Sequence, residues 1–423
     1  MADVDNIRVL SVCTSDVSGG AARAAYRIQE GVRSLGVDSR MFVKNKGSHD
    51  PNVHALSEFV PNNPIYSALD WCAAKVKNKI QHYYWNQYSN RDTNFKSDLR
   101  GTRLHGALQS WDYDVLHLHW INNRFVHIDD LRKIHKPIVW TLHDTWPFCG
   151  ICHYFNDCEN YMHQCGYCPQ LGSNNPNDLS HRVWMRKAEV FKDLDLHIVS
   201  PSRWMADCAR QSLLFKDCDI RVIPNCLDAA LFKPTSHHKV NTKPTILYGA
   251  MNAAKDARKG FSFLLAALRI LDNQGFEAQV LVFGANQQEL PMQFSHINVQ
   301  FVGYIHDTLQ LVSLYNIADV MVVPSLNENL SCAIMESMSC GTPVVAFNIG
   351  GNEDMIDHMH NGYLAREKDS EDLAKGIQWC YSHNADNELG KAARDKVLNN
   401  YTTAKVADLY KSLYRSLAKE YKT

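Results

Sequence analysis

Two glutamates eight positions apart, Glu328 and Glu336, carry the clearest chemical signal in the chain, within "PSLNENLSCAIMESMSCGTPVVAF". The pattern predicts a strand that ends near Pro324, a loop that holds Glu328 and a helix that holds Glu336. A buried carboxylate is costly unless a partner binds it. Two acids in these places favour binding to hydroxyl groups, such as the diols of a ribose and of a sugar. The alternative is a helix-end acid followed by a solvated surface residue.

Backbone amides between the two acids favour an anion. Asn329, Leu330, Ser331 and Cys332 lie where the helix is predicted to begin. The N–H groups and the dipole at a helix N-terminus attract phosphate. Because a carboxylate repels a phosphate, we expect the acids to bind hydroxyl groups on either side of a diphosphate.

A second predicted helix start carries two cations, in "GAMNAAKDARKGFSFLLAAL", where Arg258 and Lys259 precede Gly260. Positive charges there would stabilise the negative charge that grows on a leaving diphosphate in the transition state. An ordinary exposed loop is the alternative interpretation.

Histidines lie at the ends of two strands predicted in the N-terminal half. In "VWTLHDTWPF", His143 ends a strand and Asp144 follows it. In "LHLHW", His117 and His119 point to the face opposite their apolar neighbours. These residues are candidates for contact with a substrate, and a purely structural role is the alternative.

The first predicted helix follows a glycine pair, Gly19 and Gly20, in "VSGGAARAAYRI". The segment matches neither the G-x-G-x-x-G fingerprint of dinucleotide-binding domains nor the phosphate-binding loop of nucleoside triphosphatases. The pattern therefore argues against NAD and ATP as ligands.

Five cysteines gather in the loop 149–168, "CGICHYFNDCENYMHQCGYC". Two C-x2-C pairs separated by twelve residues are close to the spacing of a zinc ribbon. A structural zinc ion is one hypothesis. The other is a set of reduced thiols in a compact loop, in which oxidation could link a pair.

Composition excludes several classes of function. The 423 residues are enough for two domains, and 45% of them are apolar. Because 44 Lys and Arg balance 45 Asp and Glu, bulk charge gives no reason to expect nucleic acid. The N-terminus lacks the basic residues of a signal peptide, and no apolar run approaches the ~18 residues of a membrane span. We therefore expect a cytoplasmic protein.

Strands that alternate with helices position these residues. Strand patterns occur on both sides of a linker-like run, "VIPNCLDAALFKPTSHHKVNTKP". They predict an α/β protein with two Rossmann-like, doubly wound parallel-sheet domains, over residues 1–225 and 226–402. Ligands of such sheets bind beyond the carboxyl ends of the strands, so the cleft between the domains is the expected site. Residues 403–423 are predicted to form one amphipathic helix that packs across the domain boundary, with an apolar face of Val406, Leu409, Tyr410, Leu413 and Leu417.

The stretch "PSLNENLSCAIMESMSCGTPVVAFNIGG" resembles the E-x7-E signature of retaining glycosyltransferase family 4, which has the two-domain GT-B fold. The resemblance implies that Glu328 contacts the transferred sugar and that Glu336 binds the ribose of the nucleotide. It also implies that the amides of residues 329–332 bind the phosphates. The family often has glycines after the first glutamate, where this chain has Asn329 and Ser331.

The same resemblance assigns roles to the cations and to the base-binding segment. Lys259 matches a family lysine that precedes the helix glycine, whereas Ala250 stands where the family has an arginine. Arg258 is a candidate to replace that charge. The segment "FVGYI" is similar to the one whose backbone reads the base, and it leaves uracil and guanine open; its candidate residues are Gly303, Tyr304 and Ile305.

In the N-terminal half, the resemblance implies that His143 is a catalytic-centre histidine that touches the reacting sugar. The loop of Gly19 and Gly20 is implied to approach the donor phosphate. His119 and Asp144 are the candidates for the acceptor side.

The cysteine loop resembles that of bacterial exopolysaccharide transferases of the colanic-acid type, in which "TLHD", a tryptophan, "CHY" and "CG-x-CPQL" recur together. The last four cysteines are the characteristic ones in that subgroup. The resemblance implies no metal in catalysis, and it makes the candidate ligands of a structural zinc Cys152, Cys158, Cys165 and Cys168.

The predicted function is that of a metal-independent, retaining, hexosyl-transferring enzyme. It would move a sugar from a UDP- or GDP-sugar to a glycan or lipid-linked acceptor in the synthesis of cell-surface polysaccharide such as O-antigen. Two alternatives stay open: a nucleotide-sugar epimerase of the same fold, and a catalytically inactive scaffold that binds sugar nucleotides.

Residues 66–88 show helical periodicity and carry Lys75, Lys77 and Lys79 ahead of a group of aromatic residues. Such a helix would rest on the inner face of the plasma membrane, where lipid-linked acceptors lie. A packed surface helix is the alternative.

Overall fold

The chain forms two compact units in a computed structural model, which describes residues 7–59, 86–90, 108, 111–235, 243–250, 252, 255–286 and 293–422. The first unit comprises residues 1–201, 205–223 and 407–423, and the second comprises residues 202–204 and 224–406. The helix predicted to contact a membrane lies outside the described residues from 66 to 85. Within the described residues, no helix combines the length and the apolar composition that crossing a bilayer requires.

The first unit is built on a sheet of seven parallel strands in the order β3-β2-β1-β4-β5-β6-β7. The strands are β1 (Arg8–Ser15), β2 (Asp38–Asn45), β3 (Val53–Ala55), β4 (Val115–Leu118), β5 (Ile138–Thr141), β6 (Leu196–Ser200) and β7 (Asp219–Val222). The order reverses between β1 and β4, which are paired neighbours. Ligands of open α/β sheets bind beyond the carboxyl ends of the strands at such a switch point.

The first unit contains four α-helices and four short 3₁₀ helices among the described residues. Their bounds are α1 (Gly20–Ser34), α4 (Leu179–Phe191), α5 (Arg203–Gln211) and α12 (Thr403–Lys422), with short 3₁₀ helices η1 (Leu56–Glu58), η2 (Ile128–Lys133), η3 (Asn160–Met162) and η4 (Pro169–Leu171). Helix α4 begins at Asp178, whose carboxylate accepts a hydrogen bond from the backbone N–H of His181. Such an N-cap contributes about 1 kcal/mol.

The C-terminal helix α12 supplies residues 407–422 to the first unit. Its buried face includes Val406, Tyr410, Leu413 and Leu417, as predicted. The prediction for Leu409 is wrong, because this side chain is 47% exposed. Tyr414 belongs to the buried face instead: it is fully buried, and its hydroxyl lies 2.6 Å from Nδ1 of His117 on β4.

The second unit is built on six parallel strands in the order β10-β9-β8-β11-β12-β13. The strands are β8 (Thr245–Gly249), β9 (Ala278–Phe283), β10 (Ile297–Gly303), β11 (Val320–Val323), β12 (Val344–Phe347) and β13 (Gly362–Ala365). Here the switch point lies between β8 and β11.

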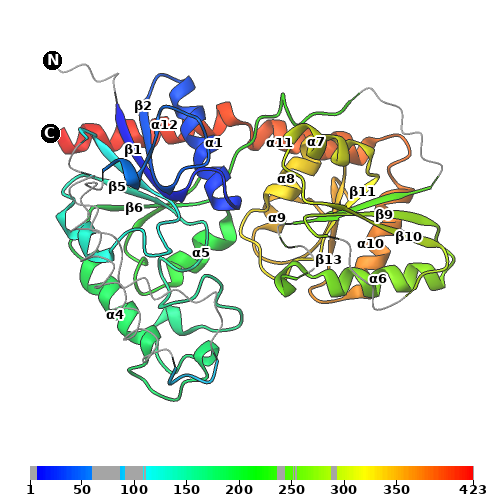
Figure 1. Cartoon of the computed structure of the whole chain (residues 1–423), viewed down its shortest axis with the longest axis horizontal. Helices are drawn as coiled ribbons and strands as arrows, with labels where there is room; N and C mark the ends of the chain where they lie inside the picture. The colour runs from blue at the N-terminus through cyan, green and yellow to red at the C-terminus, as the bar shows by residue number, and fades with distance from the viewer. Residues whose placement is uncertain are drawn as a thin grey trace. The chain divides into compact units, whose positions relative to one another are not determined.

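Helices cover both faces of this second sheet: α7 and α8 lie on one face, and α6 and α10 lie on the other (Figure 1). The bounds are η5 (Ala257–Lys259), α6 (Phe261–Asn273), α7 (Thr308–Ile317), α8 (Cys332–Ser339), α9 (Asn352–Met355), α10 (Ser370–Ser382) and α11 (Glu388–Asn400). Alternate residues along β11 enter the two cores: Met321 and Val323 face α8, whereas Val320 and Val322 face α6 and α10.

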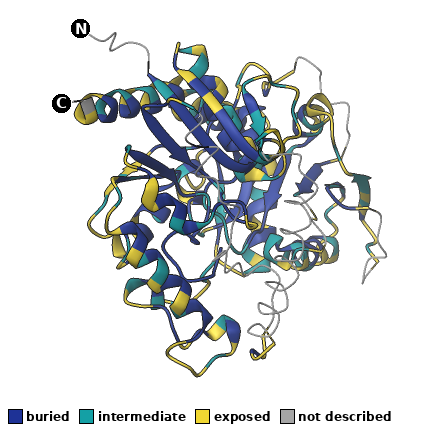
Figure 2. Ribbon diagram, turned by 60° about the vertical axis from the view of Figure 1, so that its left-hand side comes forward, coloured by how far each residue is buried: buried dark blue, intermediate teal, exposed yellow. Residues whose placement is uncertain are grey.

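Strands buried on both faces explain the continuous apolar runs in the sequence. Every residue of β4, β5, β11 and β12 is buried (Figure 2). The prediction of an α/β protein with two Rossmann-like, doubly wound parallel-sheet domains is confirmed.

Candidate functional site

The second unit joins a lysine to an acid at its switch point. Lys259 ends η5 in the segment after β8, and Glu328 lies in the loop after β11. The Nζ atom of Lys259 lies 2.6 Å from Oε1 of Glu328. The two side chains are 26% and 12% exposed, so both reach solvent. The structure therefore places a cation and a carboxylate together where an α/β sheet presents ligands.

Glycines let these two loops approach each other and their neighbours. Gly260 follows Lys259 with φ +71°, and a Cβ built there would lie 1.8 Å from the carbonyl oxygen of Pro324. Gly350 has φ +54°, and a Cβ there would lie 1.9 Å from the carbonyl oxygen of Glu328. Any other residue at either position would push the loop of Glu328 away.

Arg258 lies beside the pair but has an acidic partner of its own. Its guanidinium donates to both carboxylate oxygens of Asp256, at 3.1 and 2.5 Å. Asp256 also caps η5 by accepting from the backbone N–H of Arg258. Arg258 and Lys259 are therefore each paired with a carboxylate, that of Asp256 and that of Glu328 respectively.

Glu336 is buried inside α8 and is held by a tyrosine. Only 3% of the residue is exposed, and its Oε2 accepts a hydrogen bond of 3.1 Å from the hydroxyl of Tyr315 on α7. All residues from Ile334 to Ser339 are buried, as the small side chains of this helix predict. The alternative of a solvated Glu336 is therefore wrong.

The start of α8 follows directly on Glu328. The N-cap Ser331 makes no side-chain cap hydrogen bond with the described residues. Leu330 is buried in the core of the unit. The side-chain oxygen of Asn329 accepts a hydrogen bond of 2.7 Å from the hydroxyl of Ser202. Cys332 is the first residue of the helix and is half-buried.

The predicted base-binding segment follows β10. Gly303 ends this strand with φ +81°, at an irregularity in its pairing with β9. Tyr304 is exposed, with its hydroxyl 3.4 Å from Oδ1 of Asn252, and Ile305 is half-buried. The exposed ring offers an aromatic face at the same edge of the sheet as Lys259.

In the first unit, three side-chain pairs link the adjacent strands β4 and β5 at a constant offset of 24 residues. His117 Nε2 lies 2.8 Å from the hydroxyl of Thr141, and His119 Nδ1 lies 3.0 Å from Nε2 of His143. One residue further, Nε1 of Trp120 donates to Oδ2 of Asp144 at 2.7 Å. The backbone register pairs His117 with Val139, so each of these side chains contacts a residue two positions beyond its backbone partner.

Burial keeps the three histidines of these pairs neutral near pH 7. It lowers the pKa of His117 to about 3, with repulsion from His143 as a smaller cause. Burial likewise lowers the pKa of His143 to about 4, although Asp144 opposes this shift. The pKa of His119 is lowered well below its ordinary value by burial and by both neighbours. Neutral imidazoles can both donate and accept hydrogen bonds, which suits contact with sugar hydroxyls.

Asp144 remains a carboxylate in spite of its position. Burial alone would raise its pKa, but His153 and the hydrogen bonds from Trp146 and Trp120 outweigh burial and lower it. Nδ1 of His153 lies 2.6 Å from Oδ2 of Asp144. Sequence reasoning missed His153, because its partner is nine residues away in an irregular loop; the only signal was its place in "CHY".

Gly19 and Gly20 form the start of α1, just after β1. Gly19 has φ +96°, and a Cβ added at either position would meet no described atom within 4 Å. Open space beside a helix N-terminus leaves room for a ligand group to approach the backbone.

The five cysteines of the loop 149–168 are free thiols. The thiol of Cys152 hydrogen bonds to Cys168, which lowers the pKa of Cys168 to about 7 and, together with burial, raises the pKa of Cys152 well above its ordinary value. Within the described part of the chain, no three His, Cys, Asp or Glu side chains are grouped to hold a metal ion. The four candidate cysteines do not form a zinc-binding set in this structure, and the zinc site stays a prediction.

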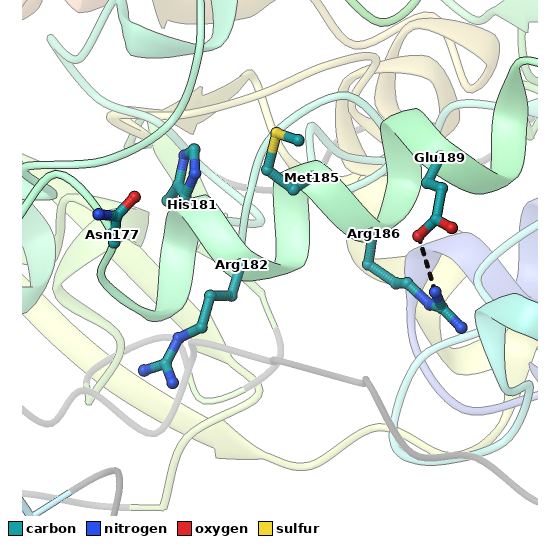
Figure 3. Close-up of a pocket in the computed structure, with 6 residues that line it drawn as sticks. All are labelled: Asn177, His181, Arg182, Met185, Arg186 and Glu189. Carbon is teal, nitrogen blue, oxygen red and sulfur yellow. Dashed lines mark hydrogen bonds and ion pairs between the residues drawn. The ribbon is translucent and has the colours of Figure 1, made fainter.

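An open groove of about 460 Å³ runs beside α4. It is lined by Asn177, His181, Arg182, Met185, Arg186 and Glu189. Figure 3 shows these side chains, all but Asn177 on α4, with Arg186 paired to Glu189. Arg186 is also paired with Asp129 at 2.5 Å, so two carboxylates offset its charge.

Two family models match the chain, one in each half. The model described as "Glycosyltransferase Family 4" matches residues 18–231, and the model described as "Glycosyl transferases group 1" matches residues 243–383. The two matches together include both sets of site residues.

Curated relatives are similar over part of their length. The chain is 28% identical over 269 residues to the putative colanic acid biosynthesis glycosyl transferase WcaC of Escherichia coli, over 60% of this chain and 64% of that protein. It is 26% identical over 211 residues to the UDP-Gal:alpha-D-GlcNAc-diphosphoundecaprenol alpha-1,3-galactosyltransferase of Escherichia coli, over 46% and 54%. The chain thus covers less than two thirds of either relative.

The fold has solved counterparts. The structure of Anabaena HepE in complex with UDP and glucose superposes with a TM-score of 0.62 and 16% identity, over 96% of this chain and 99% of that one. At this identity the likeness shows the fold, which is the GT-B arrangement of two Rossmann-like domains.

Proposed function

Because the chain belongs to Glycosyltransferase Family 4, we propose that it is a retaining glycosyltransferase that uses a nucleotide-diphosphate sugar. The acceptor is a glycan or a lipid-linked saccharide, and the product belongs to a cell-surface polysaccharide. The observation that carries the proposal is the contact of 2.6 Å between Lys259 and Glu328, at the switch point of the second sheet.

In this proposal, different residues of the second unit bind different parts of the donor. Lys259 and the amides at the start of α8 bind the diphosphate and stabilise its charge as it leaves. Glu328 accepts hydrogen bonds from hydroxyls of the sugar, and Glu336 accepts them from the ribose. Tyr304 and the backbone after β10 contact the base, and UDP is the favoured carrier because HepE and the galactosyltransferase relative are named with UDP.

Retention follows if the leaving phosphate takes the proton of the acceptor hydroxyl on the same face of the sugar. In that case the protein has to hold the phosphate and orient the sugar, and it needs no strong base of its own. The neutral pair of His119 and His143 then supplies hydrogen bonds without adding charge. Since Lys259 and the helix amides offset the phosphate charge, transfer should continue when EDTA removes divalent metals.

The nature of the acceptor rests on the relatives. One is named for colanic acid biosynthesis and the other for transfer to a diphosphoundecaprenol-linked sugar. We propose a saccharide acceptor of this class, carried by a lipid at the inner face of the plasma membrane, where the protein would act as a peripheral enzyme.

A donor screen followed by a transfer assay tests the proposal. UDP- and GDP-hexoses are first tested by thermal shift on the full chain, and each donor that binds is then incubated with a panel of octyl and aryl saccharides. We expect one donor to bind and release of the nucleotide diphosphate to require a saccharide. Conversion of the donor without any saccharide would indicate an epimerase instead, and the absence of binding by every donor would overturn the proposal.

A further inference from the structure

His153 has one fixed and one unpartnered ring nitrogen. Its Nδ1 lies 2.6 Å from Oδ2 of Asp144, and both residues are 8% exposed. The other nitrogen, Nε2, is buried and has no hydrogen-bond partner among the described residues. Leaving a buried polar atom unpaired costs about 1–3 kcal/mol, so this arrangement calls for an explanation.

The loop that carries His153 is held tightly in place. Asp144 accepts from Nε1 of Trp120 at 2.7 Å and from the backbone N–H of Trp146 at 2.9 Å. Thr145 donates to the backbone carbonyls of Cys152 and His153, at 3.3 and 3.2 Å. With the ring and the backbone both fixed, Nε2 is held in one direction.

This nitrogen belongs to the same edge of the first sheet as the histidine pair. The ring of His153 lies 5.6 Å from that of Trp120, the residue that follows His119 at the end of β4. Nε2 of His119 is likewise buried and unpartnered among the described residues. Two ring nitrogens that have no partner in the described part of the chain therefore lie beyond the carboxyl ends of β4 and β5, beside the switch point of the sheet.

We propose that His153 binds the acceptor, with its Nε2 hydrogen bonded to a hydroxyl group of the acceptor saccharide. Asp144 is then a positioning residue, because its two oxygens are taken by Trp120, Trp146 and His153 and it acts through the imidazole. The inference rests on the proposed transferase function and deepens it by naming a specific contact on the acceptor side.

Two substitutions of His153 separate this role from a structural one. In His153→Asn, the side-chain amide nitrogen lies as many bonds from the backbone as Nδ1 does, so it keeps a donor for Asp144 and loses the outer nitrogen. In His153→Gln, the amide nitrogen corresponds to Nε2, so the variant keeps the outer group and loses the contact with Asp144. A binding role and a structural role thus predict opposite rankings of the two variants.

The test measures transfer by the full chain from the donor and to the aryl saccharide that the screen selects. We expect His153→Asn to raise the KM for the acceptor at least tenfold with a smaller change in kcat, and His153→Gln to stay within about threefold of the parent KM. The matched control is His163→Asn, an exposed histidine of the same loop, with an unchanged acceptor KM.

An acceptor KM that is lower in the asparagine variant than in the glutamine variant would overturn the inference while leaving the transferase function intact. If either variant melts more than 10 °C below the parent, Asp144→Asn takes its place, and an unchanged acceptor KM in that variant would overturn the inference equally. Absence of transfer by the parent chain would instead remove the proposed function and the inference together.

Discussion

The two switch points of the molecule are built from different kinds of chemistry. In the second unit, a lysine and a glutamate meet at 2.6 Å with both side chains partly exposed. In the first unit, the corresponding strand ends carry buried imidazoles whose pKa values lie far below the ordinary range. One edge carries a partly exposed ion pair, and the other carries buried neutral imidazoles beside the buried carboxylate of Asp144.

This difference matches the charges of the two ligands that the proposed reaction requires. A nucleotide diphosphate carries negative charge that increases as the sugar leaves, and a cation at the strand end stabilises it. The hydroxyl groups of an acceptor sugar carry no charge, and burying a charged histidine beside them would cost desolvation without a counter-charge. The site in the second unit should therefore be most sensitive to removal of a charge. The site in the first unit should be most sensitive to protonation of a histidine or to loss of a hydrogen bond.

Removing the charge of Lys259 should have the largest effect. We expect Lys259→Met to lower kcat/KM by about 100-fold to 1,000-fold, because the developing phosphate charge loses its closest cation. Steady-state kinetics with saturating acceptor measure this loss. Lys255→Met, which removes an exposed lysine of the same segment, is the control and should change kcat/KM by less than twofold.

The pairing itself can be tested by adding Glu328→Gln to that variant. Because the two side chains contact each other, their effects on kcat/KM should be less than additive. Fully additive losses would show that Lys259 and Glu328 act separately, and the contrast between an ionic and a neutral edge would lose its main support.

Among the residues described, the first unit contains a single buried cation, and it supports the loop that follows Asp144. Lys187 is 1% exposed, and its Nζ donates to the backbone carbonyls of Trp146, Cys149 and Gly150 while lying 3.5 Å from the ring of Trp146. We expect Lys187→Met to lower the free energy of unfolding by about 3 kcal/mol, because three buried carbonyls lose their donor. Urea titration measures this change.

The exposed Lys192→Met at the end of the same helix is the control and should stay within about 0.5 kcal/mol of the parent. Donor binding by calorimetry adds a second comparison and should be unchanged, since the proposed donor contacts belong to the second unit. A Lys187→Met chain that is as stable as the parent would mean that the loop is held by its other contacts.

The candidate residues of the two units differ in how far a local sequence pattern relates them. Glu328 and Glu336 lie on one strand–loop–helix segment, so spacing alone relates them. The contact of Asp144 with His153 and the burial of Lys187 depend on where an irregular loop folds back onto a helix. Hydrophobic periodicity carries no information about such a loop, and a lysine on an amphipathic helix is expected at its surface.

The histidine pairs fall between these cases. The residues "LHLHW" and "TLHD" were placed correctly at the ends of strands, but the contact between His119 and His143 depends on β4 being the neighbour of β5 in this register. A sequence alone does not fix the order of strands in a sheet. Even with that order known, the register pairs His117 with Val139, whereas the side chain of His117 contacts Thr141, two residues further along β5.

Low pH should lower the stability of the first unit, because its buried histidines resist protonation in the folded state. The folded pKa of His117 is about 3, against an ordinary value of 6.5, so below pH 6.5 the unfolded chain binds a proton that the folded chain excludes. Stability is therefore complete above pH 6.5 and falls as the pH decreases toward 3, by about 1.4 kcal/mol per pH unit for this residue. Urea titrations at pH 7.5 and pH 5.0 measure the loss.

We expect His117→Asn to remove about 2 kcal/mol of the stability that the parent loses between these two pH values. Thr141→Val is the control, because it removes the hydroxyl partner of His117 and retains the imidazole. It should lower stability at both pH values by a similar amount. An equal dependence on pH in the parent and in His117→Asn would show that this histidine is not held neutral.

The smallest effect concerns the hydrogen bond between Tyr315 and the buried Glu336. The hydroxyl of Tyr315 holds the buried carboxylate of Glu336 at 3.1 Å, so Tyr315→Phe leaves that acid in place but less well oriented. We expect the KM for the donor to rise about fivefold, which corresponds to about 1 kcal/mol for a single hydrogen bond, with little change in kcat. The control is Tyr401→Phe, which removes a buried hydroxyl bonded at 2.6 Å to the backbone carbonyl of Asp354 in the same unit. Both variants should have a lower free energy of unfolding, but only Tyr315→Phe should raise the KM for the donor. An equal rise in donor KM for both variants would mean that Glu336 is oriented by the packing of α8 alone.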